Sequence, residues 1–272
     1  MLSGTFSMLL PTAEKKNAFY EDFFKKYSLL ISTNLIVYDA IDAFSEQRIF
    51  EEFSKFNGSY NDYKDKEVFQ TFMLLEDNYP QKKEQRGLFL NTFFIDRATG
   101  QKDSKSFIIS AVNIKEFTLL YALFEGVMKE FFRANKVLDK EEYLNEKDII
   151  TKFASSSAVN KKLFLQEMRN RSPLSTFDGI NTFWLYFTHF RHLYFHSGGY
   201  VTKQWFNKYI QKKEDIIKKI SKFNDITTAS QLCDAIKAWE VTENKMCYME
   251  DNFVNFFRNF IIRFMESMYL SG

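Results

Sequence analysis

The chain has 272 residues and a mass of 32.4 kDa, enough to bury a hydrophobic core in one large domain or two small ones. Apolar residues make up 45% of the chain and charged residues 26%, a balance that excludes an intrinsically disordered protein. The net charge of +2 does not by itself indicate a nucleic-acid-binding protein. Only 3 prolines and 9 glycines interrupt the sequence, so long helices are favoured over a strand-rich fold with frequent turns.

Cysteine use and hydrophobic patterning bear on the compartment. Cys233 and Cys247 would lie roughly 21 Å apart on one helix, too far for a disulfide, so we expect free thiols in a reducing cytoplasm. The first residues lack a basic start and Pro11 breaks their apolar run, which does not fit a signal peptide. Residues 253–270 are apolar but carry three charged side chains, typical of an amphipathic core helix. We therefore predict a cytoplasmic protein with no membrane contact.

The first part of the chain mixes helical and β-prone patterns. Apolar residues recur at helical spacing, and an Asn-Gly-Ser break separates the longer helices from a shorter one. The helices expected here span residues 13–32, 34–56 and 66–76. Two β-prone runs on either side of Gly100 predict a β-hairpin over residues 88–110. We therefore expect an N-terminal region over residues 1–110 that contains a small hairpin.

From residue 113 the helical pattern is strong. Asn113 can cap a helix, with Glu116 three residues later as in a capping box, and an apolar stripe follows over residues 117–131. Further helices are expected at residues 140–153, 159–169, 177–195, 202–222, 229–248 and 251–269. The sequence thus predicts a mainly α fold, with a helical bundle over residues 111–272.

All three histidines fall within eight residues, as His189, His192 and His196, and Arg191 lies among them. Cleaving RNA internally needs a base for the 2′-hydroxyl proton, an acid for the leaving oxygen and a cation for the charged phosphorane. Imidazole can act as base or acid near neutral pH, and the planar guanidinium matches two phosphate oxygens. One arginine and one histidine could therefore cleave RNA without a metal.

The segment from Arg191 to His196, Arg-His-Leu-Tyr-Phe-His, resembles the R-x4-H signature of HEPN domains, in which a polar residue, here His192, commonly follows the arginine. It ends a long apolar helix before a glycine pair, and an upstream Phe-Glu-Gly element containing Glu125 also resembles HEPN domains. The resemblance covers residues 113–222. It implies a helical HEPN fold, a metal-independent endoribonuclease with no cofactor, Arg191 and His196 as its catalytic pair, and products ending in a 2′,3′-cyclic phosphate.

The roles of the neighbouring residues stay open at this point. His192 either contacts the phosphate together with His196, one helical turn away, or orients Arg191. Glu125 either holds Arg191 or a histidine by a charged hydrogen bond or is an ordinary surface carboxylate. His189 is expected to be structural.

The spacing of the motif raises a geometric question. On an ideal helix Arg191 and His196 lie roughly 140° apart, so they do not share a face. Either His196 swings out at the glycine pair or two chains bring their motifs into one cleft. The HEPN resemblance implies the second arrangement, a homodimer with a composite active site. It also implies defence against phage, as a toxin or abortive-infection component, with an antitoxin or regulatory partner.

A lysine-rich segment follows the motif, with seven lysines and two acidic residues over positions 203–222. It is either a solvated helix face or a surface for RNA, whose phosphates would make binding weaken with salt. The lysines expected to contact RNA are Lys203, Lys208, Lys212 and Lys213. Trp205 is expected to stack on a base.

Two other classes of function remain open. His189, His192 and His196 share a helix face to within about 40° and could bridge a metal ion, although no HExxH glutamate accompanies them. A non-catalytic HEPN scaffold that binds RNA or a protein is the other alternative, and the intact motif favours catalysis over it. Dinucleotide-binding and P-loop enzymes are excluded, because no GxGxxG or P-loop sequence occurs.

Overall fold

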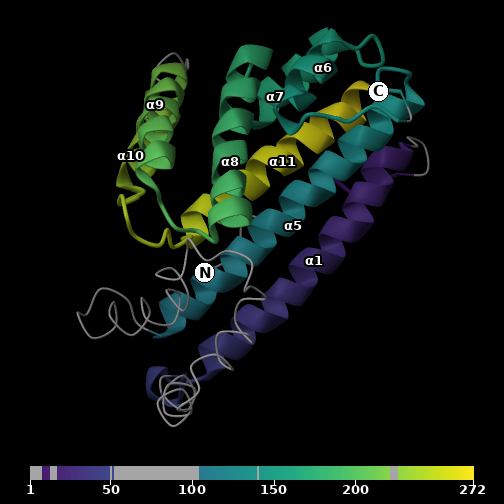
Figure 1. Ribbon diagram of the computed structural model, residues 1–272. Coiled ribbons are helices and arrows are strands. Elements are labelled where there is room, and N and C mark those ends of the chain that lie inside the picture. Colours follow the sequence, from purple (N-terminus) through teal and green to yellow (C-terminus); the bar gives the residue numbers. More distant parts are fainter. Residues whose placement is uncertain (1–7, 13–16, 50, 52–103, 140, 221–225) are drawn as a thin grey trace. The chain divides into compact units, whose positions relative to one another are not determined.

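The computed structural model is mainly helical and describes residues 8–12, 17–49, 51, 104–139, 141–220 and 226–272 (Figure 1). Its helices are α1 (Ala18–Ala43), α5 (Ser104–Ala134), α6 (Ile149–Ser155), α7 (Lys161–Arg171), α8 (Phe177–Ser197), α9 (Lys203–Ile220), α10 (Ile226–Ala238) and α11 (Asp251–Ser271), with a short 3₁₀ turn, η2 (Glu146–Asp148). Within these ranges, β structure is limited to one bridge between Tyr200 and Met246. The predicted mainly α fold is confirmed. In the same ranges, no helix combines the length and the apolar character that crossing a membrane requires.

The chain divides into two compact units. The larger comprises the described residues up to Asn34 and from Asn113 onward, and the smaller comprises those between Leu35 and Val112. One division, between Val112 and Asn113, is close to the predicted boundary near residue 110. The described residues up to Asn34, however, belong with the C-terminal helices and not with the region that follows them. Within the smaller unit, the Lys105 backbone N–H donates to the Glu46 carboxylate at 3.0 Å.

Two predictions about the start of α5 are wrong. Residues 106–110, expected to form a β-strand, belong to the first turns of α5. The rest of the predicted hairpin and the helix expected at residues 66–76 lie outside the described residues. Asn113 caps nothing: it is buried inside α5, where its Nδ2 donates to the Met249 carbonyl at 3.0 Å and to Asp251 Oδ1 at 2.8 Å. Contacts from distant parts of the chain thus override the local signals for strand and cap.

A buried ion pair joins α5 to α11 in the larger unit. The Glu116 carboxylate, expected to complete a capping box, accepts hydrogen bonds from Arg258 Nε at 2.9 Å, from Arg258 Nη2 and from Asn34 Nδ2 at 2.8 Å. Arg258 is 1% exposed and also donates to Asn255 Oδ1 at 2.6 Å. A buried charge is costly unless it is paired and hydrogen-bonded, so neither Glu116 nor Arg258 can lose its partner without a large penalty.

Aromatic side chains fill the space between α5, α8 and α11. Tyr121 of α5 stacks on Trp184 of α8 with 4.5 Å between ring centroids. Phe117 of α5 and Phe187 of α8 both meet Phe257 of α11 edge-on, at 4.6 and 4.8 Å. The abundant phenylalanine of the sequence therefore serves packing here. This packing holds α8 in place, and the last turns of α8 carry the Arg/His motif.

Several helices differ from prediction by more than a few residues. The helix expected over residues 140–153 begins only at Ile149, as α6, after the 3₁₀ turn η2. α1 continues through Thr33, where a break was expected, and the Thr33 hydroxyl donates to the Leu29 carbonyl at 2.9 Å. The helix expected over residues 229–248 ends at Ala238, and the chain after it pairs with the segment that follows α8. The Cys247 N–H donates to the Gly199 carbonyl at 2.9 Å within this pairing. The segment 239–250 therefore runs across the end of α8.

Candidate functional site

The ends of α8 are set by local sequence. Thr176 caps its start, accepting a hydrogen bond from the Gly179 N–H at 3.1 Å. Gly198 and Gly199 end it with φ angles of 55° and 89°, a region that favours glycine. At Gly199 a Cβ atom would also lie 3.3 Å from the Tyr194 ring, so a side chain would be crowded as well as strained. Because α8 continues through Ser197, the motif does not swing out of the helix before its end.

A carboxylate of η2 brings the motif residues together. Glu146 Oε2 accepts a hydrogen bond from Arg191 Nη1, and Glu146 Oε1 is hydrogen-bonded to His192 Nε2. Arg191 Nη2 lies 3.6 Å from Glu125 Oε2, and the rings of His192 and His196 meet edge-on at 5.5 Å between centroids. We refer to these five residues as the Arg–His cluster. The structure thus brings together the four residues proposed from the sequence for catalysis and adds Glu146.

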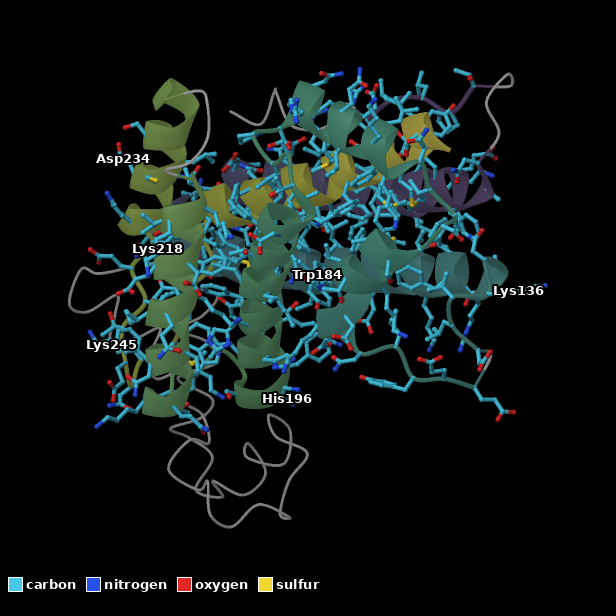
Figure 2. All side chains as sticks on the ribbon, turned by 90° about the horizontal axis from the view of Figure 1, so that it is seen from above. Lys136, Trp184, His196, Lys218, Asp234 and Lys245 are labelled. Carbon is cyan, nitrogen blue, oxygen red and sulfur yellow. The ribbon has the colours of Figure 1, made fainter. Side chains whose placement is uncertain are left out.

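The Arg–His cluster is closed on one side and open on the other. The Arg191 guanidinium lies over the rings of Tyr121 and Phe195, at 4.9 and 4.8 Å from their centroids. Its side chain is 20% exposed and that of Glu146 only 10%. His196 is exposed at the end of α8, and Trp184 lies deeper in the same helix (Figure 2). Phe195 beside it is 56% exposed, so a large molecule could reach this end of the helix.

No pattern in the sequence indicated a role for Glu146. It is 45 residues before Arg191, and no local pattern sets it apart from the acidic residues around it. The structure fixes it through its backbone: the Trp184 indole N–H donates to the Glu146 carbonyl at 2.6 Å, and Asn145 caps η2 by accepting from the Lys147 N–H at 3.1 Å. The backbone of Glu146 is therefore held by contacts that do not depend on the charge of its side chain.

Burial shapes the protonation of Glu125, a member of the Arg–His cluster, and of its neighbour Tyr121. Burial is the main cause that raises the pKa of the Glu125 carboxyl; the Arg191 charge opposes this shift and the Glu146 charge adds to it. Burial also raises the pKa of Tyr121, whose hydroxyl lies 2.9 Å from Thr188 Oγ1. Tyr121 therefore stays protonated at neutral pH and cannot serve as the base.

His189 is turned to a different partner. Its ring stacks on Trp205 with 4.3 Å between centroids, its Nε2 donates to the Trp205 carbonyl at 3.1 Å, and the Trp205 indole N–H donates back to the His189 carbonyl at 3.0 Å. Burial lowers the pKa of His189 to about 4, so it is neutral at pH 7. Across the described part of the chain, no group of three or more His, Cys, Asp or Glu side chains could hold a metal ion. The three-histidine metal site is therefore not formed.

Helix α9, which carries most of the lysine-rich segment, packs against α8 (Figure 1). Burial lowers the pKa of Lys212, and the positive charges of Lys147 and Lys208 lower it further, whereas Asp215 opposes them. Lys147 directly follows Glu146. We call Lys147, Lys208 and Lys212 the basic patch. The predicted contact Lys203 is exposed at the start of α9.

Two residues proposed to contact RNA are instead used inside the fold. Lys213 Nζ donates to the carbonyls of Lys237 and Trp239 at 3.1 and 3.2 Å, so it ties α9 to the end of α10. Trp205 is 9% exposed and its ring lies against His189, which leaves no free face for a base. The sequence could not distinguish these residues, because their partners lie on other helices. The last lysine of the segment, Lys222, lies outside the described residues.

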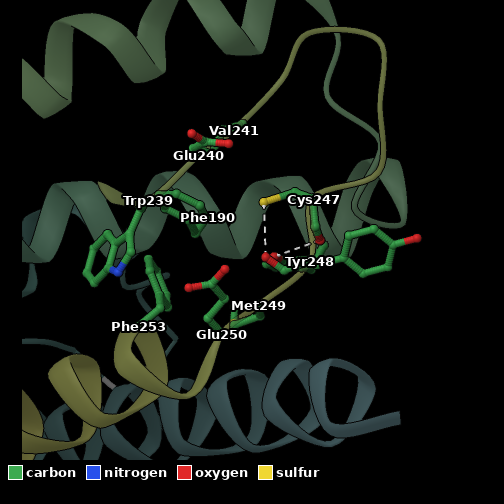
Figure 3. Close-up of a pocket in the computed structure, with 10 residues that line it drawn as sticks. Phe190, Trp239, Glu240, Val241, Cys247, Tyr248, Met249, Glu250 and Phe253 are labelled. Atoms are coloured by element: carbon green, nitrogen blue, oxygen red, sulfur yellow. Dashed lines mark hydrogen bonds between the residues drawn. The ribbon is translucent and has the colours of Figure 1, made fainter. Parts of the chain in front are cut away.

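A small cavity lies behind the end of α8, under the segment 239–250 (Figure 3). Its volume is about 30 Å³, enough for a water molecule but not for a substrate. Phe190, Trp239 and Phe253 form its apolar wall, and the Tyr194 hydroxyl donates to the Cys247 carbonyl at 3.2 Å beside it. The cavity therefore belongs to the packing that holds the end of α8.

Chemically, the site offers a guanidinium held by carboxylates, an exposed imidazole one turn away, and a basic patch beside them. This combination suits a phosphodiester, since the cations attract phosphate and the imidazole can move a proton. No family model matches this sequence, and no curated protein or solved structure proved similar to it. The function is therefore proposed from the site and from the HEPN-like motif.

Proposed function

We propose that this protein is a metal-independent endoribonuclease of the HEPN type that uses Arg191 and His196 as its catalytic pair. The observation that supports this most directly is the gathering of Arg191, His192 and His196 at the accessible end of α8, with Arg191 held between carboxylates and aromatic rings. The basic patch beside the cluster offers charges for the RNA backbone.

In the proposed reaction, Arg191 binds the non-bridging oxygens of the scissile phosphate and stabilises the charge that builds up on them. His196 takes the proton from the 2′-hydroxyl, and the 2′-oxygen attacks phosphorus. The bond to the 5′-oxygen breaks, this oxygen takes a proton from a second imidazole, and a 2′,3′-cyclic phosphate remains. His192 shares the Glu146 carboxylate with Arg191, so its proposed role is to position Arg191.

The second imidazole is proposed to be the motif histidine of another copy of the chain, in a homodimer with a composite site. The exposed ring of Phe195, next to His196 and under the Arg191 guanidinium, offers an apolar contact for such a copy. Light scattering tests this point, and a strict monomer at the concentrations where RNA is cleaved would contradict it. The proposed setting, a toxin or abortive-infection component with an antitoxin or regulatory partner in the cytoplasm, follows from the HEPN resemblance.

The decisive experiment is incubation of the purified protein with total RNA in the presence of EDTA. We expect cleavage with 2′,3′-cyclic phosphate ends, and no cleavage by the Arg191→Ala, His196→Ala double variant. Arg169→Ala is the matched control, because Arg169 is an exposed arginine of α7 outside the site. Activity that disappears in EDTA and returns with zinc would instead indicate metal-assisted hydrolysis. A folded wild-type protein that leaves RNA intact would contradict the proposal.

One observation favours the alternative, a non-catalytic HEPN scaffold that binds RNA or a protein partner. Both terminal nitrogens of Arg191 already face carboxylates, those of Glu146 and Glu125, so a phosphate would compete with both for the guanidinium. A scaffold would bind RNA as well after loss of Arg191 and His196 as before, and neither protein would cleave it.

A further inference from the structure

A larger cavity lies in a different part of the same unit, between α7, α8, α10 and α11. Its volume is about 390 Å³, within the range of small-molecule sites. None of its lining residues belongs to the Arg–His cluster or the basic patch. Its wall on α8 is Phe183, which is two turns before the motif and therefore roughly 12 Å along the helix from Arg191.

The lining combines apolar side chains with two arginines. Phe183, Leu232, Phe256 and Phe260 form most of the apolar wall. The polar groups are Arg171, Arg263, the amide of Asn259 and the hydroxyl of Ser172. Sites for small organic molecules have this composition, mostly apolar with a few polar groups that fix orientation.

Each arginine is held in place by a glutamate that does not line the cavity. Arg171 Nη2 lies 3.2 Å from Glu167 Oε2, and Arg263 Nη1 lies 2.9 Å from Glu266 Oε2. Each guanidinium carries further N–H donors beyond these single contacts. The Nε atom of Arg171 is buried and has no hydrogen-bond partner among the residues that the structure describes. Because this Nε atom is buried, an anion in the cavity would bind the remaining terminal N–H groups of the two guanidiniums instead.

We propose that this cavity binds a small amphipathic anion, with its carboxylate or phosphate group at Arg171 and Arg263 and its apolar body against the phenylalanine rings. The two guanidiniums supply the charge complementarity, because both lie at the cavity while their glutamate partners lie outside its lining. The apolar wall excludes a fully hydrated ion such as sulfate as the best-fitting occupant. The proposal does not depend on the nuclease activity.

The test is calorimetric titration of the full chain with octanoate, octyl phosphate and neutral octanol, together with thermal unfolding. We expect either anion to bind and to raise the unfolding temperature, and octanol to bind at least tenfold more weakly. The anion that binds more tightly shows whether the cavity prefers a carboxylate or a phosphate group. Equal binding of octanol, or no binding of either anion by the folded protein, would overturn the proposal.

Variants locate the site. Arg263→Met and Arg171→Met should each weaken anion binding about tenfold, whereas Arg169→Met, on the exposed side of α7, should leave it unchanged. Leu232→Trp should block binding by filling the cavity, and it keeps the test valid if an arginine variant fails to fold. Wild-type affinity in Leu232→Trp and in both cavity-arginine variants would show that the anion binds elsewhere and would overturn the assignment.

Discussion

Replacement of Glu146 by glutamine separates the two roles that its carboxylate could have. Glu146 contacts Arg191 and His192, the residues that are proposed to meet the scissile phosphate and to position the guanidinium. Glutamine keeps the shape of the side chain but removes its negative charge. The backbone carbonyl that accepts from the Trp184 indole is untouched, so η2 should stay in place. The variant therefore removes the negative charge and one accepting oxygen while leaving the backbone contacts of η2 in place.

The magnitude follows from the contacts. A hydrogen bond to a charged group contributes about 1.5–3 kcal/mol, which corresponds to about 10- to 150-fold in an equilibrium constant. Arg191 is 20% exposed and keeps Glu125 as a neighbour at 3.6 Å, so solvent and the second carboxylate reduce the gain. We expect Glu146→Gln to bind RNA about tenfold more tightly and to cleave it faster, because phosphate no longer competes with a full negative charge.

Affinity is measured by fluorescence anisotropy with RNA whose 2′-hydroxyls are replaced by hydrogen, so that no cleavage occurs. Cleavage rates come from the matching RNA with intact 2′-hydroxyls. Glu125→Gln is expected to have a smaller effect, and Glu142→Gln, an exposed residue paired with Lys152, none. If Glu146→Gln instead loses cleavage as Arg191→Ala does, while staying folded, Glu146 orients Arg191 and does not restrain it.

Three further results are expected. Lys212→Glu should weaken RNA binding and reduce the slope of log affinity against log salt by about 0.7–0.9. Lys213→Gln, which loses contacts within the protein, should lower stability and leave the slope unchanged. The pKa of His189 is about 4, so the folded state binds fewer protons than the unfolded state; stability is complete above about pH 6.5 and falls towards pH 4. Between pH 7 and pH 5 the wild type should therefore lose about 2 kcal/mol more than His189→Phe in urea unfolding, and equal losses would contradict this. Glu116→Gln should destabilise the fold by about 3–5 kcal/mol, and Glu116→Leu with Arg258→Met by much less than the sum of the single changes, as measured in a double-mutant cycle.

The helices were predictable where local chemistry determines them. α8 was expected over residues 177–195 and spans Phe177–Ser197, because the Thr176 cap and the glycine pair act locally. α11 likewise begins at Asp251 as predicted. Residues 106–110 are β-prone by composition but form helix within α5, since a propensity of this kind is weaker than tertiary packing. The early end of α10 also depends on pairing with a distant segment.

The candidate site was predictable in its motif and not in its surroundings. Arg191, His192 and His196 stood out because histidine is rare in this chain and the three positions lie within two turns. Glu146 comes from a separate turn and resembles many other acidic residues in the sequence. Trp205 and Lys213 share a helix with the exposed lysines, and only the position of their partners shows that they contact other helices.

Gly199 affects how mutational data on this protein should be read. Any side chain at this position would face both an unfavourable φ of 89° and the ring of Tyr194 at 3.3 Å. A screen that scores only loss of activity would therefore place Gly199 beside Arg191, although Gly199 has no side chain that could take part in the proposed reaction. Measuring both activity and unfolding separates Gly199 from Arg191, because a variant in which Gly199 is replaced should lose its folded state along with its activity.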